Sequence, residues 1–487
     1  MRKIFAALLP LILCVSAYDQ KTNKDIFDEF LEKSSSEFES FRDRNNRQYA
    51  EFLLSNWEQF HASEPIPKPV IKPFPPVVYT DTVHHETSKF YICDAFYFAK
   101  DLISRGKKAG STLIASQKTD FWEHQFRDCD FSCFGREMKV RVPNGKEFKL
   151  QSVSPSDLSK AWKELSKPRY ECILEDCTAL KKEHNMCDWA YLKMLKTFSD
   201  SYLSESPEST FLTAYIYTQS GYKMRLGLDG QTLYFLFGTD YTLYDVPYYN
   251  IDGTKYYIYG SDADYMSIAN ITYPEEADLS LLFSDDQKFG IELAPERTIT
   301  SERLGVISHC SVNREKIKFY DSYPAAQLGD DYMTRWALAA KIPLGEEVTR
   351  LLYPELRKKI EGKGLAEATD ILLDFVQTGL TYKVDDEVWG EDRVFYADET
   401  LYYPYCDCED RSILFSILVR DLLGLEVALV YYPNHLAAAV KLPEDTEGDA
   451  IQLPTGRFVI CDASYIGANI GMTIPGMDNS TASIIVL

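Results

Sequence analysis

The fold of this chain is decided by the stretch Asp407-Cys408-Glu409-Asp410-Arg411-Ser412-Ile413-Leu414. Apolar residues then recur at helical spacing as far as Gly424, which predicts a helix that begins at Cys408. The free amides and the dipole at that end of a helix favour a thiolate over a thiol. Glu409 and Asp410 would oppose the thiolate if they pointed inward, and Arg411 would offset them.

Three strands are expected after this helix. Leu425 to Tyr432 reads as a strand, Pro433-Asn434 as a turn and His435 to Lys441 as the returning strand. The segment from Arg457 to Asp462 is the third strand. The predicted order is therefore one apolar helix followed by strands.

Three residues of this region have the side chains that acyl-transfer chemistry needs. His435, the only histidine after His309, opens one strand, and Asp462 ends another. A cysteine nucleophile requires a base, and the base requires a carboxylate that orients it. We therefore predict a catalytic triad of Cys408, His435 and Asp462.

These motifs resemble the transglutaminase-like superfamily of papain-like cysteine enzymes. In that superfamily a cysteine heads an apolar helix with a small residue four positions on, which matches Cys408 and Ser412. A glycine closes the helix, a histidine opens a strand and an aspartate follows a hydrophobic strand, which matches Gly424, His435 and Asp462.

The resemblance covers roughly the last third of the chain, from about Ile342. Asp407-Cys408-Glu409-Asp410 is especially similar to the bacterial cysteine-proteinase branch, and Leu372 to Gln377 and Tyr382 fit the helix and the strand that enter such domains. Two stretches depart from the family pattern. The family often has Trp soon after the histidine, and Asp-Pro-Thr or Asp-Thr-Thr at the aspartate, where this chain has Leu436 to Val440 and Asp462-Ala463-Ser464.

The resemblance implies acyl-enzyme chemistry. Cys408 would attack a carbonyl carbon, His435 would take and return the proton, and Asp462 would hold the imidazole in its useful tautomer. The backbone amide of Cys408 would supply one oxyanion donor, with Gln377 or Tyr403 as the candidate second donor.

Several functions fit this pattern. The first is a cysteine protease, amidase or acyltransferase that hydrolyses or transfers amide-linked acyl groups on a peptide or protein. The alternative is a catalytically silent binding or scaffold protein with a tyrosine-rich middle domain that holds a glycan or a protein. A third is a cell-wall cysteine peptidase, against which Asp462 argues. In a purely structural interpretation without catalysis, Cys408 is buried or forms a disulfide with Cys406.

The remaining sequence predicts a multidomain α+β protein with an N-terminal helical segment, a β-rich middle domain and the transglutaminase-like α+β domain. The expected divisions are a signal peptide at 1–17, an amphipathic helical segment at 18–63, a Pro-rich linker at 64–78, the middle domain at 79–330 and the transglutaminase-like domain at 331–487. We expect the linker to be a tether along the next domain rather than a ligand for a partner's aromatic groove.

The N-terminus predicts export, and the resemblance implies that the protein is bacterial. Met1-Arg2-Lys3 precedes an apolar run from Ile4 to Val15 and small residues up to Ala17, the pattern of a cleaved signal peptide. The run is too short to span a bilayer, so the mature chain is expected to have no transmembrane segment and to be periplasmic, secreted or on the outer surface. A Leu precedes Cys14, so we expect no lipid anchor there.

The net charge excludes one class of partner. The chain has a formal charge of −22, which repels nucleic acid and anionic lipid. We therefore expect no nucleic-acid partner, whereas a peptide or protein substrate is what the resemblance implies.

The middle region is expected to be mixed. Helices are predicted at 156–165 and 188–198, and strands at 211–217, 222–228, 233–237 and 256–259, with hairpin turns at Asp229-Gly230 and Asp252-Gly253. Its tyrosines predict a half-buried sheet face, with a glycan- or peptide-binding surface as the alternative.

We expect no cofactor and no metal. Cys172, Cys177, His184 and Cys187 lack a standard zinc spacing, and export favours disulfides among most of the cysteines. Asp262-Ala263-Asp264 and Asp385-Asp386-Glu387 lack the glycine and distal glutamate of a calcium loop, so both are read as solvated turns.

Overall fold

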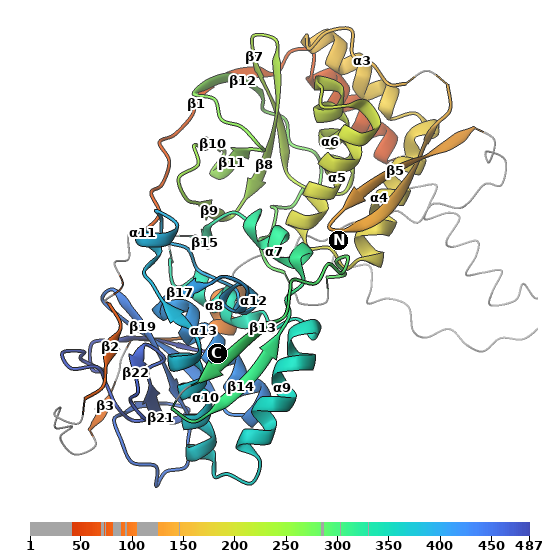
Figure 1. Cartoon of the computed structure of the whole chain (residues 1–487). Coiled ribbons are helices and arrows are strands. Elements are labelled where there is room, and N and C mark those ends of the chain that lie inside the picture. The colour runs from red at the N-terminus through yellow and green to blue at the C-terminus, as the bar shows by residue number, and fades with distance from the viewer. Residues whose placement is uncertain are drawn as a thin grey trace, which may run out of the picture.

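The computed structural model describes residues 41–69, 73, 75–80, 89–92, 95–104, 125–145, 147–283, 287–301, 303–329 and 331–487. The signal peptide predicted at 1–17, with Cys14, and residues 18–40 of the predicted helical segment lie outside these residues. The described residues form two lobes, one above the other in Figure 1. Both lobes contain helices and sheets, so the predicted α+β class is confirmed.

The N-terminal lobe is built on an antiparallel six-stranded sheet. Its strand order is β1 (Trp57–His61), β12 (Tyr265–Ala269), β7 (Met224–Asp229), β8 (Thr232–Thr239), β11 (Thr254–Ile258) and β10 (Tyr249–Ile251). Figure 1 shows helices beside this sheet. They are a helix over residues 41–52, α3 (Pro155–Leu165), α4 (Glu171–Glu183), α5 (Asp188–Leu203) and α6 (Pro207–Gln219). A hairpin of β5 (Phe126–Cys133) and β6 (Arg136–Pro143) packs on α4 and α5.

Two elements of this lobe differ from the sequence prediction. Residues 211–217 were expected to be a strand but lie inside α6, because Ser206 caps the helix by accepting from the Ser209 amide and Pro207 occupies its first turn. The helix is buried on all sides, which removes the apolar stripe that identifies a helix in a sequence. Conversely, Trp57–His61 was expected to be helical and forms the edge strand β1, paired with β12.

The tyrosines of the lobe are mostly core residues. Tyr217, Tyr222, Tyr249 and Tyr257 are fully buried. Tyr249 and Tyr257 lie on the sheet strands β10 and β11, whereas Tyr217 lies in α6 and Tyr222 precedes β7, so these side chains belong to the core rather than to a half-buried sheet face.

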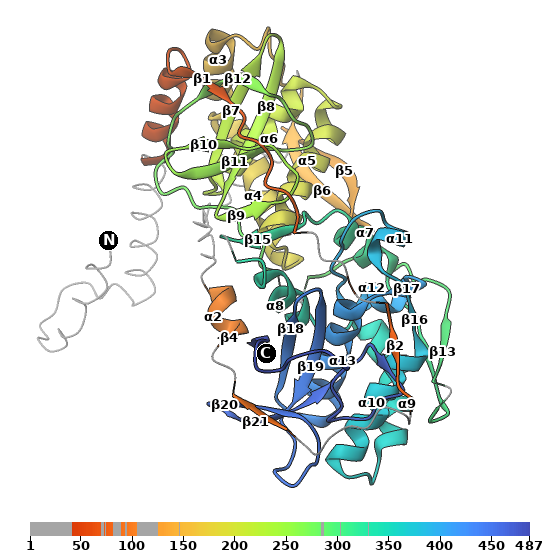
Figure 2. The same ribbon diagram turned by 90° about the vertical axis from the view of Figure 1, so that its left-hand side faces the viewer.

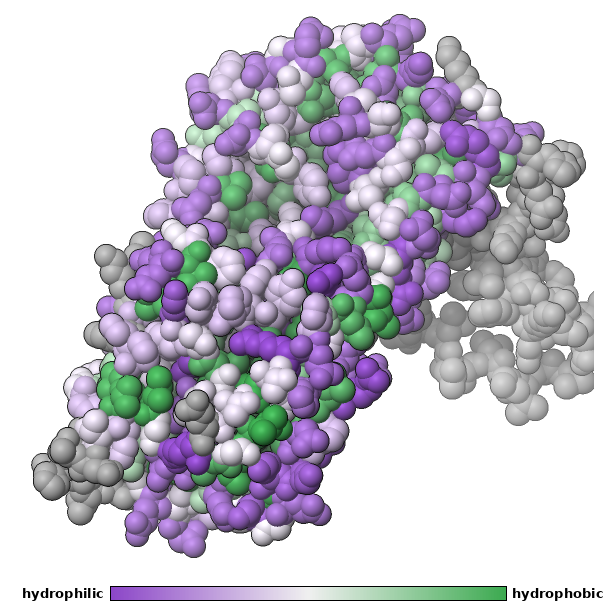
Figure 3. All heavy atoms as spheres, in the orientation of Figure 1, coloured by the Kyte–Doolittle hydropathy of each residue, from purple (hydrophilic) through white to green (hydrophobic). Residues whose placement is uncertain are grey.

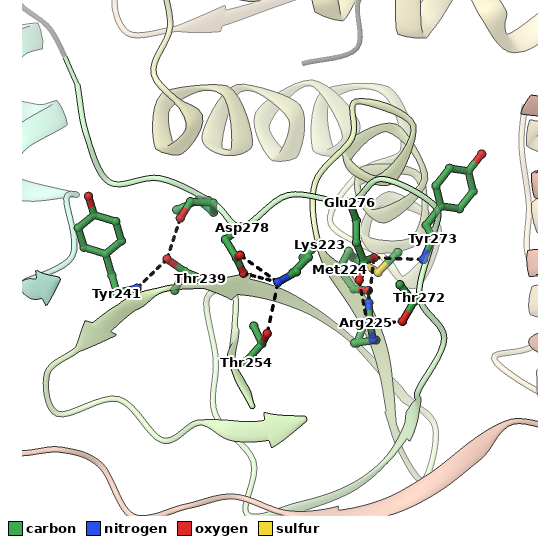
Figure 4. A network of polar contacts seen from close by, with 11 residues as sticks. Lys223, Met224, Arg225, Thr239, Tyr241, Thr254, Thr272, Tyr273, Glu276 and Asp278 are labelled. Atoms are coloured by element: carbon green, nitrogen blue, oxygen red, sulfur yellow. Dashed lines mark hydrogen bonds and ion pairs between the residues drawn. The ribbon is translucent and has the colours of Figure 1, made fainter. Parts of the chain in front are cut away.

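A polar network fastens the segment after β12 to the sheet (Figure 4). Lys223 pairs with both oxygens of Asp278 at 2.9 Å, and the buried Arg225 pairs with Glu276 at 3.0 Å. Since both cations lie at the start of β7 and are paired, the network holds residues 272–279 in place and offers no vacant site.

The C-terminal lobe contains a seven-stranded sheet whose two edges belong to one short segment. The order is β3 (Phe90–Ile92), β20 (Ala450–Leu453), β21 (Gly456–Cys461), β19 (His435–Val440), β18 (Val427–Tyr432), β23 (Ser483–Val486) and β4 (Phe96–Phe98). The end of β3 and the start of β4 are at most about 14 Å apart along the chain. In a flat sheet they would be about 29 Å apart. The sheet is therefore strongly curled, so that its edges approach each other.

Apolar side chains fill both faces of this curled sheet. On one face, Leu429, Leu436 and Val440 join the main core, and on the other Val430, Ala437 and Ala439 join a second core with Phe96 and Phe98. Alternation along each strand separates the two sets. Because β19 is central and buried on both faces, the residues after His435 are small and apolar.

The helix α13 (Cys408–Leu423) packs on β19 and β18 and is the centre of the lobe. The elements around it are α9 (Glu346–Ile360), α10 (Leu365–Gly379), α11 (Asp385–Val388), α12 (Ala397–Tyr402) and the pairs β13 (Arg297–Ser301) with β14 (Val306–Cys310), β16 (Thr381–Tyr382) with β17 (Tyr405–Cys406), and β2 (Val77–Val78) with β22 (Tyr465–Ile466).

The packing shifts two of the predicted divisions. Residues 90–92 and 96–104, assigned to the middle domain, form β3, β4 and α2 (Ala99–Ser104) in the C-terminal lobe, because β3 and β4 complete its sheet and α2 packs on α8 (Thr334–Lys341). The hairpin β13–β14 packs on α9 and α10 and therefore also belongs to the C-terminal lobe. Its residues come before residue 331, where the transglutaminase-like domain was expected to begin. The lobes meet around α7 (Arg314–Asp321) and where β15 (Ala326–Leu328) pairs with β9 (Tyr241–Leu243).

Among the described helices, none has the length and apolar character needed to cross a bilayer. The face in Figure 3 is dominated by hydrophilic side chains, with apolar ones in small separate groups.

Candidate active site

The start of α13 is fixed by a capping box. Asp407 accepts from the Glu409 amide at 3.1 Å, and Asp410 accepts from the Asp407 amide at 3.1 Å. Gly424 ends the helix in the left-handed conformation, with φ 67°. The structure therefore places Cys408 at the first position of the helix, as the sequence predicts.

The Cys408 sulfur contacts groups from two other elements. It accepts from the backbone amide of Leu436 in β19, and the Tyr382 hydroxyl lies within hydrogen-bonding distance of the thiol. Ser412 donates to the Leu436 carbonyl at 2.8 Å, which ties α13 to the same residue of β19. The small residue of the motif thus serves to dock the strand that begins with His435.

His435 and Asp462 form a buried pair. Their Nε2 and Oδ2 atoms are 2.8 Å apart, and their side chains are only 2% and 3% exposed. Asp462 also accepts from the Ser464 amide at 2.8 Å, and Tyr432 stacks on the imidazole at 6.0 Å between ring centroids. A carboxylate at Nε2 leaves Nδ1 as the basic nitrogen of the neutral ring. That Nδ1 is buried and makes no hydrogen bond, so the thiol and the imidazole are not bonded to each other.

The cysteine is held as a neutral thiol. Burial, followed by the charges of Asp407 and Glu409, raises the pKa of Cys408 well above its usual value. Glu409 and Asp410 are buried and point inward, the orientation that opposes a thiolate. In this closed arrangement burial outweighs the helix dipole.

Arg411 has its guanidinium bonded to backbone carbonyls and to Cys406 rather than to the acids beside Cys408. Its guanidinium, fully buried, donates to the backbone carbonyls of Gln377, Leu380 and Ala463 and lies 5.1 Å from the centre of the Tyr382 ring. Arg411 therefore connects the end of α10 to the loop that carries Asp462.

Gln377 has a different role from the predicted one. Its Nε2 donates to the carbonyls of Asp462 at 2.9 Å and Ala468 at 3.2 Å, and its Oε1 accepts from the Gly467 amide at 3.1 Å. Since both amide hydrogens are engaged by backbone carbonyls, Gln377 positions the Asp462 loop and is not available as an oxyanion donor. The Tyr403 hydroxyl donates to Asp321 at 2.7 Å, which engages the other candidate donor as well.

Three buried carboxylates beside the site could share a cation. Asp385, Asp392 and Glu409 each offer one oxygen, and these oxygens lie within 4.8 Å of one another. Arg335 supplies a counter-charge, paired with Asp392 and 3.6 Å from Glu409. Burial raises the pKa of Asp385 to about 7 and that of Glu409 to about 8. Asp385 is thus no solvated turn residue, in contrast to the sequence prediction, whereas Asp262 and Asp264 are exposed as predicted.

The cysteines in the described part of the chain do not pair with one another. Nine are free thiols among the described residues, including Cys406 beside the site, although export by itself would favour disulfides. Cys172, Cys177, His184 and Cys187 do not gather into a metal cluster in the described part of the chain. Cys187 instead caps α5 by accepting from the Ala190 amide. Cys93 lies outside the described residues.

Sequence reasoning missed Tyr382 and the role of Arg411. Tyr382 was read only as part of an entering strand, and its pairing through β16 with β17, next to Cys408, is a long-range contact. Arg411 lies about one helical turn after Cys408, and residues at that spacing lie on the same face of a helix. This spacing is the sequence signal that the Arg411 side chain faces the interior together with Cys408.

Comparison with known proteins gives no relative: no family model, no curated protein and no solved structure matches this chain.

Proposed function

We propose that this chain is a transglutaminase-like cysteine enzyme that hydrolyses or transfers amide-linked acyl groups on a peptide or protein. One observation carries the proposal. His435 is bonded to Asp462 at 2.8 Å with its other nitrogen unpartnered, and the next residue, Leu436, donates its amide to the Cys408 sulfur. A nucleophile, a base and an orienting carboxylate are thereby gathered at one helix end.

The chemistry follows from these positions. His435 Nδ1 takes the proton of Cys408, and the sulfur attacks the carbonyl carbon of the substrate, whose oxygen becomes an oxyanion. Collapse of this intermediate breaks the C–N bond, and the imidazolium returns the proton to the leaving amine. Water or an acceptor amine then attacks the thioester and releases Cys408 as a thiol. The Cys408 amide and the Tyr382 hydroxyl are the groups placed to stabilise the oxyanion.

This reaction requires the site to open. Cys408 is 1% exposed and is held neutral by burial. Substrate binding must therefore bring the thiol into reach of Nδ1, as is common where catalytic hydrogen bonds tighten only in the complex. We also propose that the protein is bacterial and exported, with residues 1–17 as its signal peptide.

The second candidate is a silent member of the same fold that binds a protein or glycan. The missing thiol–imidazole hydrogen bond favours it, because a site that never opens would keep the cysteine as a buried thiol.

Two measurements, peptide turnover and the rate of thiol labelling, distinguish the enzyme from the silent protein. The mature protein is incubated with a peptide library and, separately, with iodoacetamide, followed by mass spectrometry of each cysteine. The enzyme proposal expects cleaved or acyl-transferred peptides, a loss of at least about 10³-fold in Cys408→Ser, and faster labelling of Cys408 than of Cys406. The control is Cys406→Ser, equally buried and two residues away, which should keep its activity. Equal and slow labelling of both thiols, unchanged in His435→Ala, with no product, would favour the silent protein.

A further inference from the structure

A cavity of about 310 Å³ lies where the two lobes meet. Tyrosine side chains from both lobes line it, among them Tyr241 and Tyr244 from the N-terminal lobe and Tyr396 from the C-terminal lobe. Its volume is at the lower end of the range of small-ligand sites. Arg335 forms part of its lining and also lies 3.6 Å from Glu409, the residue after Cys408. Asp392, which also lines the cavity, offers an oxygen within 4.8 Å of one from Glu409, so two lining side chains connect the cavity to the candidate active site.

The chain already places a lysine in this cavity. The segment 63–69, here called the strap, leaves β1 and runs down between the lobes, as the red trace below β1 in Figure 2 shows. Lys68 lines the cavity, and its Nζ donates to Glu391 at 2.8 Å and to the Asp392 carbonyl at 2.8 Å. Its side chain is 13% exposed.

The strap is held as an extended peptide would be. Ser63 and Ile66 form β-bridges with Tyr248 and Tyr244, and the Asp245 amide donates to the Ile66 carbonyl at 2.9 Å. Main-chain bonds of this kind fix an extended segment without regard to its sequence, while a pocket selects one side chain. The strap thus shows how a Lys-containing peptide fits this groove.

The charges of the cavity select a cation. Among the described residues, five carboxylates line it, together with the cations Lys68, Arg335 and Arg393. Arg393 is paired with Asp321 and Glu399, and Arg335 with Asp392. Without Lys68 the lining carries an excess of acid, and its tyrosine rings offer faces that favour ammonium and guanidinium groups.

We propose that this interlobe cavity is a binding site for a basic side chain of an extended peptide, with Lys68 of the strap as its resident occupant. This inference rests on the proposed function, in which the ligand is the substrate. The lysine or arginine of the substrate enters the cavity beside Arg335, while its acyl group reaches Cys408.

Chemical rescue tests the site without any turnover. In Lys68→Ala, n-butylammonium replaces the missing side chain and should raise the thermal midpoint by about 2–4 °C at saturating concentration. Uncharged n-butanol should not do so, and neither compound should shift Lys363→Ala, a matched variant of a lysine paired with Glu367 on the surface. An equal response to both compounds, or a shift of the control variant, overturns the proposal.

Peptide binding gives the second test. The probe is the strap sequence Glu64 to Pro69 as a labelled, end-blocked peptide, and its partner is the full chain carrying Cys408→Ser and Lys68→Ala. The lysine peptide should bind at least about 10-fold more tightly than the same peptide with norleucine, and Glu391→Gln should reduce the difference. Equal affinities overturn the inference. Because Cys408 is absent, this result is independent of whether the enzyme proposal succeeds.

Discussion

His435 and Asp462 are joined by a 2.8 Å contact between Nε2 and Oδ2, although His435 begins β19 and Asp462 lies in the loop directly after β21. Two further residues fix the loop on which Asp462 lies. Gln377 donates to the Asp462 carbonyl, and Arg411 donates to the carbonyls of Gln377 and Ala463. The imidazole orientation is therefore determined by α10 and α13 as well as by the sheet.

The first prediction concerns this contact. Asp462→Asn keeps the shape of the side chain but favours the wrong imidazole tautomer, so turnover should fall by on the order of 10³–10⁴-fold with little change in thermal midpoint. Steady-state kinetics and a melting curve measure both effects. Asp370→Asn is the matched control, because that carboxylate accepts from the Ile470 amide and does not contact His435. Equal losses in the two variants would contradict an orienting role.

A second prediction separates positioning from oxyanion stabilisation at Gln377. Gln377→Leu leaves the Asp462 and Ala468 carbonyls without their donor, which should cost about 2–4 kcal/mol of unfolding free energy. Chemical denaturation measures that cost, and activity should fall because Asp462 loses its place. A stable variant with a large loss of kcat would instead indicate that Gln377 acts on the substrate.

The third prediction follows from the buried carboxylates. The pKa values of Asp385 and Glu409, about 7 and about 8, lie above their ordinary values, so the native state keeps protons that the unfolded chain has lost. Their stabilising contribution is complete below about pH 4 and is lost as the pH rises through 7 and 8. The unfolding free energy should therefore decline over this range.

The variant Asp385→Asn with Glu409→Gln should flatten that decline, since neither amide titrates. Denaturation at several pH values between 4 and 8.5 measures the slope. Glu367→Gln is a suitable control, because Glu367 is an exposed partner of Lys363. A double variant with the same slope as the parent chain would show that other groups cause the decline.

The sequence predicted the elements around the site well and their contacts less well. Cys408 heads a helix, His435 opens a strand and Asp462 follows one, because turn signals and apolar periodicity are local. The hydrogen bonds and contacts of Gln377, Arg411 and Tyr382 could not be predicted, since each of these residues contacts others that are far away in the chain. The burial of Asp385 against Glu409 also depends on tertiary packing, as does the use of residues 90–98 to complete both sheet edges.

The last prediction concerns Tyr382, the hydroxyl placed beside the Cys408 thiol. If this hydroxyl stabilises the oxyanion, Tyr382→Phe should lower kcat by about 10²-fold. The Cys408 alkylation rate should then change by much less, since alkylation forms no oxyanion. Arg411 lies 5.1 Å from the centre of the ring, which phenylalanine keeps, so the thermal midpoint should change little. Rate measurements on one preparation give both values, with Tyr403→Phe as the control, whose hydroxyl binds Asp321 instead. Parallel losses of kcat and of alkylation rate would mean that Tyr382 acts on the thiol and not on the substrate oxygen.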